Sequence, residues 1–205
     1  MKINFLYICE GSSDSSLIDH IKSTLIECGA DEADGECPDF SIFPKPVGRD
    51  VKIKVDAALK YRPGANCIFI HRDADNAGVD VRKEEILNAT KHINKNIKVV
   101  PIIPIKMLES WLLVSERSIR IAAENRNGNM KLNLPKPSNI ERLSDPKGYL
   151  KKVLTEASGL TGKRLKKFSF EKARHYLVQN IDFNGEIKNL GSHKDFLNSV
   201  NKLFL

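Results

Sequence analysis

The first half of the chain alternates short apolar segments with amphipathic ones, and this alternation restricts the fold more than any other feature. Apolar segments rich in β-branched and aromatic residues predict strands, and apolar residues recurring every three or four positions predict helices. The predicted strands span 3–9, 40–44, 67–70 and 97–105, and the predicted helices span 15–28, 51–61 and 79–93. This order predicts an α/β fold with a parallel sheet of about four strands and helices on its faces.

Three further expectations concern the last strand and the connections between the predicted elements. Pro101 and Pro104 predict that the last strand either lies at an edge or ends early, because proline cannot donate to a central ladder. The segment 29–39 is acidic, contains glycine and shows no periodicity, so it is predicted to be a surface loop. Residues 44–50 are predicted to form a turn.

After Lys106 the pattern becomes helical. Helices are predicted over 107–114, 115–124, 170–180 and 196–205, with a loop over 125–139 and a basic link over 159–167. Another helix begins at Asp145, with Asp145 as its N-cap and Pro146 at its first position. We therefore predict an α/β core over 1–115 and a helical C-terminal region over 116–205, packed on the core as one unit.

Composition limits the class of protein. The 205 residues are 41% hydrophobic and 29% charged, which is typical of a globular chain, and the net charge of +7 favours a polyanionic partner. A lysine-rich soluble surface would give the same charge. The four cysteines lack paired spacing, so zinc and disulfides are not expected and a reducing, cytoplasmic compartment is the simplest interpretation. No apolar run is long enough to span a membrane.

Acidic residues follow two of the predicted strands. Asp73 and Asp75 follow the strand at 67–70, and Glu10 follows the first strand. The carboxyl ends of parallel strands share one edge of a sheet, so these three carboxylates are expected to converge if the two strands are adjacent in space. Such a cluster is costly without a cation, and Mg²⁺ prefers oxygen ligands. The alternative is that these residues belong to ordinary solvated turns.

Two more acids are candidates for the same site. Glu109 lies within an otherwise apolar helical segment, and a buried glutamate needs a partner or a metal. Alternatively, Glu109 lies on the solvent face of an amphipathic helix. Asp14 is a candidate ligand and equally a candidate helix cap.

These motifs, in this order, resemble a TOPRIM domain, the metal-binding α/β module of several topoisomerases, primases and nucleases. The likeness rests on Glu10-Gly11-Ser-Ser-Asp14, on Asp73-Ala-Asp75, on Glu109-Ser-Trp, and on Asp145-Pro-Lys147. In this form the chain is most similar to the small OLD/RloB-like TOPRIM proteins of bacterial defence loci. The TOPRIM motifs cover about the first half of the chain, and the Glu-Ser-Trp and Asp-Pro-Lys features extend the likeness beyond it.

The resemblance implies a set of roles. Glu10, Asp73 and Asp75 would be catalytic and would bind Mg²⁺ or Mn²⁺, Glu109 would complete a second metal position, and Lys147 would stabilise transition-state charge. Many TOPRIM proteins carry a third acid two residues beyond the Asp-x-Asp pair, where this chain has Ala77. That departure puts a two-metal arrangement in doubt.

Basic residues are the candidates for nucleic-acid contacts, because phosphate binding depends on charge rather than base sequence. Four of them lie in the basic link and one borders the acids: Lys163, Arg164, Lys166, Lys167 and Arg72. A solvated charge run explains the link equally well, and Arg72 is alternatively a counter-ion.

Three functions remain as hypotheses, two of them from different classes and the third weaker. The first is a metal-dependent nuclease that cuts DNA or RNA. The resemblance adds an ABC- or AAA-type ATPase partner and a role in phage defence. The second is a non-catalytic module that uses the same fold to bind nucleic acid or a protein partner. A phosphatase with an aspartate nucleophile is a third interpretation, and the glutamate at the first strand counts against its familiar haloacid-dehalogenase form.

Overall fold

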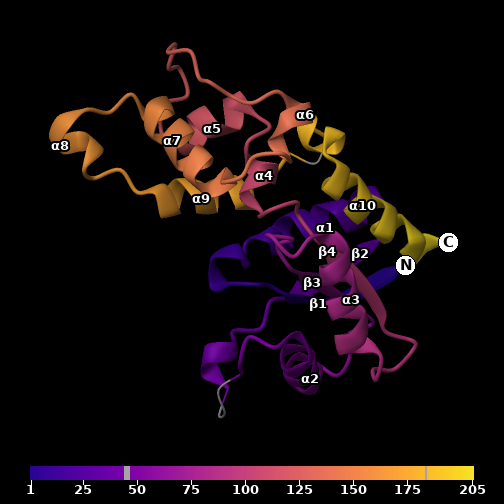
Figure 1. Ribbon diagram of the computed structural model, residues 1–205. Helices are drawn as coiled ribbons and strands as arrows, with labels where there is room; N and C mark the ends of the chain where they lie inside the picture. The colour runs from indigo at the N-terminus through magenta and orange to yellow at the C-terminus, as the bar shows by residue number, and fades with distance from the viewer. Residues whose placement is uncertain (44–46, 183) are drawn as a thin grey trace.

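A four-stranded parallel sheet organises the first half of the protein, as expected (Figure 1). The computed structural model describes residues 1–43, 47–182 and 184–205. The strand order is β2-β1-β3-β4, and the strands are β1 (Lys2–Ile8), β2 (Glu32–Glu36), β3 (Cys67–His71) and β4 (Lys98–Ile102). The predicted edge position of the proline-containing strand is confirmed, because β4 lies at one end of this order.

Alternating side chains of the central strands separate two apolar layers. Phe5 and Phe69 point to one face, where α1 (Leu17–Glu27) packs, and their rings meet edge to face with centroids 5.1 Å apart. Leu6 and Ile70 point to the other face, which α2 (Val51–Tyr61) and α3 (Val79–Thr90) cover. The two-residue period of a strand thus buries β1 and β3 on both sides.

The second strand lies where the sequence predicted a loop. Segment 29–39 contains β2, which pairs in parallel with β1, whereas Phe40–Ile42 forms a short 3-10 helix instead of the predicted strand. Residues 44–46, which the predictions assigned to the end of that strand and to a turn, lie outside the described residues. β2 is polar because it is an edge strand, and Gly35 is required because a Cβ there would overlap the Phe5 ring.

The second half is helical, as predicted, although its helices are shorter and more numerous than expected. They are α4 (Glu109–Leu112), α5 (Glu116–Ala122), α6 (Pro137–Ile140), α7 (Pro146–Ser158), α8 (Gly162–Leu165), α9 (Phe170–Gln179) and α10 (Gly191–Asn201), with 3-10 turns at Glu186–Asn189 and Lys202–Phe204. Another 3-10 turn, Ser12–Asp14, lies in the first half, between β1 and α1. Asp145 caps α7 by accepting from the backbone N–H of Gly148 at 2.8 Å, as predicted. None of the described helices is long and apolar enough to cross a membrane.

Helix α10 returns from the helical half and packs beside β4 and α1, near the N-terminus (Figure 1). His20 of α1 and His193 of α10 are both buried, and their Nε2 atoms lie 3.0 Å apart, so the N–H of one ring donates a hydrogen bond to the other ring nitrogen. Trp111 and Phe196 pack around this pair. The two halves therefore share one apolar layer at this point.

This histidine pair predicts acid sensitivity. Burial, assisted by His193, lowers the pKa of His20 to about 3, and burial, assisted by Lys188, lowers the pKa of His193 to about 4. The unfolded chain binds these protons below its ordinary pKa of about 6.5, whereas the folded chain resists them, so stability falls as the pH drops below that value. We expect a loss of about 2–4 kcal/mol between pH 7.5 and pH 5, measured by urea unfolding.

The matched variant for this prediction is His193→Gln. It removes one titrating ring, so its pH dependence should be clearly shallower than that of the native chain. If the pH dependence of the unfolding free energy were unchanged in this variant, other titratable groups would be responsible for the acid sensitivity.

Candidate functional site

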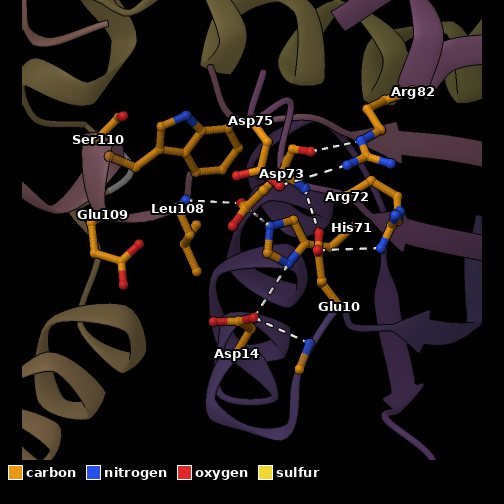
Figure 2. Close-up of polar contacts among 12 residues, drawn as sticks. Glu10, Asp14, His71, Arg72, Asp73, Asp75, Arg82, Leu108, Glu109 and Ser110 are labelled. Carbon is orange, nitrogen blue, oxygen red and sulfur yellow. Dashed lines mark hydrogen bonds and ion pairs between the residues drawn. The ribbon is translucent and has the colours of Figure 1, made fainter. Parts of the chain in front are cut away.

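The carboxyl ends of β1 and β3 bring Glu10 and Asp73 together, as strand adjacency predicted. In the parallel register Ile8 pairs with Ile70, so the residues that follow the two strands leave the sheet side by side. Glu10 Oε2 accepts from the backbone N–H of Asp73 at 2.6 Å, and its Oε1 lies 3.2 Å from Arg72 Nη1 (Figure 2). Glu10 thus reaches across from one strand to the backbone of its neighbour.

The Asp73 carboxylate is held by two further groups. Its Oδ1 accepts from the backbone N–H of Leu108 at 3.0 Å and lies 3.1 Å from His71 Nε2. The side chain keeps 20% of its area exposed, so it is oriented without being sealed from solvent. Figure 2 shows this carboxylate between His71 and Leu108.

His71 connects Asp73 to the layer beneath. Its ring is buried, and Nδ1 lies 3.4 Å from the Tyr7 hydroxyl and 3.9 Å from Asp14 Oδ2. Burial by itself would lower the pKa of His71, but the hydrogen bond and charge of Asp73, with the charges of Asp14 and Glu10, shift it upward overall. His71 lies two residues before Asp73 in the sequence, but its inward position was not predictable there, since it depends on the strand phase of β3.

Asp75 is turned differently from Asp73. Its backbone takes a left-handed φ of 47°, with its N–H donated to the carbonyl of Lys106 at 2.8 Å. The carboxylate is 44% exposed and lies 3.6 Å from Arg82 Nη2. Asp75 is therefore near the strand ends, but its carboxylate faces solvent and the Arg82 guanidinium.

Two arginines and one glutamate complete this edge. Arg82 of α3 donates through Nε to the carbonyl of Asp73 at 2.9 Å and through Nη1 to Glu85 Oε2 at 3.0 Å. Arg72 donates through Nε to the same Glu85 oxygen at 3.3 Å. Arg72 is thus a counter-ion of Glu10 and Glu85. Arg82 and Glu85 were missed, because nothing in a charged helix indicates which residues face the sheet edge.

Asp14 and Glu109 are both buried and share one cation that sequence reasoning also missed. Arg174 of α9 donates to Asp14 Oδ1 at 2.6 Å, to Glu109 Oε1 at 2.8 Å and to the carbonyl of Ser13 at 2.9 Å. Burial acts to lower the pKa of Arg174, but Glu109 and Asp14 raise it overall. The expected burial of Glu109 is correct, and the partner it requires is an arginine 65 positions away.

Lys147 and the basic link lie on the surface of the helical half. Lys147 is exposed in the first turn of α7. Lys163, Arg164, Lys166 and Lys167 are exposed in and beside α8. Arg164 and Lys167, together with Lys172 and Tyr176 of α9, line a hollow of about 700 Å³. The lining of this hollow therefore includes three basic side chains and the ring of Tyr176.

The donor chemistry decides which metal arrangement fits. Across the described residues, no group of three or more His, Cys, Asp or Glu side chains is arranged to hold a metal ion. Mg²⁺, however, commonly uses one or two carboxylates, with waters and substrate phosphates as its other ligands. Glu10 and Asp73 fit that smaller set, with Asp75 beside them. Asp14 and Glu109 fit it less well, since both already form ion pairs with Arg174.

Comparisons with known proteins place the chain in no family. It matches no protein-family model, no curated protein and no solved structure.

Proposed function

We propose that the chain is a divalent-metal-dependent nuclease of TOPRIM type that hydrolyses phosphodiester bonds in DNA or RNA. The observation that carries the proposal is the meeting of Glu10 and Asp73 at the ends of two adjacent parallel strands, where Glu10 Oε2 lies 2.6 Å from the Asp73 backbone nitrogen. Ligands of open α/β sheets bind at this edge.

The balance of charged side chains around the strand ends favours a bound cation there. Among the described residues, the connected network contains six carboxylates, and only three arginines, one histidine and one lysine contact it. The carboxylates are Glu10, Asp14, Asp73, Asp75, Glu85 and Glu109, and the cations are Arg72, Arg82, Arg174, His71 and Lys54. Negative charge remains in excess even with His71 protonated, and a bound cation would reduce the repulsion.

Glu10 and Asp73 would hold the metal, which when bound would lower the pKa of a coordinated water and neutralise charge on the phosphate. His71 and the Leu108 N–H orient Asp73, leaving its Oδ2 for a ligand. In this proposal Glu10 would also accept a proton from an attacking water. Arg82 and the exposed lysines near α8 would bind the backbone phosphates, because such contacts depend on charge alone.

The test is a titration of Mg²⁺ and Mn²⁺ into the purified chain and its Asp73→Asn variant, by calorimetry, with mixed DNA and RNA substrates assayed in parallel. We expect the native chain to bind the metal and cut, and the folded variant to do neither. Absence of metal binding by the native chain would overturn the proposal. An ATPase partner, suggested only by the family resemblance, is tested by adding candidate ATPases to the same assay.

A second function is favoured by a specific observation. Glu10, Asp14, Asp75 and Glu109 each lie against an arginine, which is the pattern of a structural ion-pair network. We propose as the alternative a non-catalytic module that binds nucleic acid or a partner protein. It predicts that Glu10→Gln and Asp73→Asn leave that binding intact and that neither metal supports cleavage.

A further inference from the structure

We propose that Cys9 and Cys37 are an oxidisable dithiol that forms a reversible disulfide beside Glu10. Cys9 follows β1 and Cys37 follows β2, so the two thiols leave adjacent parallel strands at the same edge of the sheet. The Cys37 thiol donates to Cys9 Sγ across 3.6 Å, and both are free thiols in this structure.

The distance makes a bond accessible with a small movement. A disulfide requires the sulfurs to approach to about 2.05 Å, and strands of one sheet lie within the usual range for bridged cysteines. Cys9 is buried, and Cys37 is half-buried, so a small oxidant can reach the pair from the Cys37 side. Cys28 is also half-buried, at the end of α1, but it lacks a nearby thiol among the described residues and serves as the matched control.

Hydrogen peroxide is an oxidant of the required class. One thiolate attacks a peroxide oxygen, the O–O bond breaks, and a sulfenic acid and one water are produced. The second sulfur then attacks the sulfenic sulfur, and the hydroxyl leaves as a second water. The two thiols lose two protons and two electrons, and a dithiol such as dithiothreitol reverses the change by exchange.

Because of the position of the two cysteines, a disulfide between them would restrain the backbone beside Glu10. Lys54 Nζ donates to the carbonyls of both Cys9 and Glu10, at 3.0 and 3.1 Å, so the backbone at Cys9 is held together with that of Glu10. Closing the bond would tether this segment to the end of β2 and would fix the loop from residue 9 to residue 37, which contains α1. An effect on cleavage rests on the proposed function, whereas formation of the bond does not.

The test uses the full chain under native conditions. Hydrogen peroxide is added, remaining thiols are alkylated, and peptides are mapped by mass spectrometry with and without dithiothreitol. We expect a Cys9–Cys37 linked peptide in the native chain and in Cys28→Ser, and none in Cys37→Ser. The oxidised chain should also unfold at a temperature several degrees higher, because the bond restricts the unfolded chain.

The outcomes separate the two proposals. Four alkylated cysteines after oxidation, or a linkage that involves Cys28 instead, would overturn the dithiol proposal. Thermal unfolding of Cys37→Ser shows whether that variant is folded, and Cys9→Ser provides the second variant if it is not. A linked peptide in a chain that never cuts nucleic acid would uphold the dithiol while overturning the nuclease.

Discussion

Replacing Arg174 with methionine is expected to cost about 3–5 kcal/mol of unfolding free energy, measured by urea denaturation at pH 7.5. The guanidinium is buried and contacts Asp14 at 2.6 Å and Glu109 at 2.8 Å, and both of these carboxylates are buried as well. Methionine fills a similar volume but leaves Glu109 without a counter-ion and Asp14 with only His71, whose Nδ1 lies 3.9 Å away. Breaking a buried pair in this way costs far more than losing a surface pair.

Lys172→Met is the matched control, because Lys172 lies on the same helix and is exposed. Its effect should stay within about 0.5 kcal/mol. Neutralising the carboxylates together with the arginine, in a triple variant with Asp14→Asn and Glu109→Gln, should recover a large part of the loss. If Arg174→Met were no more harmful than Lys172→Met, the ion-pair network would not stabilise the fold.

Glu10→Gln is expected to reduce metal-dependent cleavage by about 100-fold or more. The amide oxygen can still accept from the Asp73 N–H, so the fold should be retained, while the negative charge that would bind metal and accept a proton is lost. The measurement is the rate of cleavage at saturating Mg²⁺, together with a thermal unfolding curve that shows the variant is folded.

Asp80→Asn is the control for this prediction. Asp80 is an exposed acid in the first turn of α3, close in sequence to the site but outside its contacts, so its loss should leave cleavage unchanged. Native cleavage rates in Glu10→Gln would remove Glu10 from the catalytic group and favour the non-catalytic alternative.

The elements that could be predicted are those whose hydrophobic pattern is visible in a short stretch of consecutive residues. Strands β1 and β3 are buried on both faces, so their continuous apolar segments stand out, and the acids that follow them mark where they end. Strand β2 was missed for the opposite reason: it is a polar edge strand whose pairing depends on β1 rather than on its own residues. The short Phe40–Ile42 turn shows that an apolar segment alone does not make a strand.

For the candidate site, the sequence by itself determined that Glu10 and Asp73 follow strands of one parallel sheet, and the strand order, which places β1 beside β3, decided that they meet. Only the tertiary structure decided how each acid is compensated. Arg174 lies 160 positions from Asp14 and 65 from Glu109, and Cys37 lies 28 from Cys9. Such contacts have no local periodicity, since they arise when helices and strands distant in sequence pack together and bury charges that must find partners.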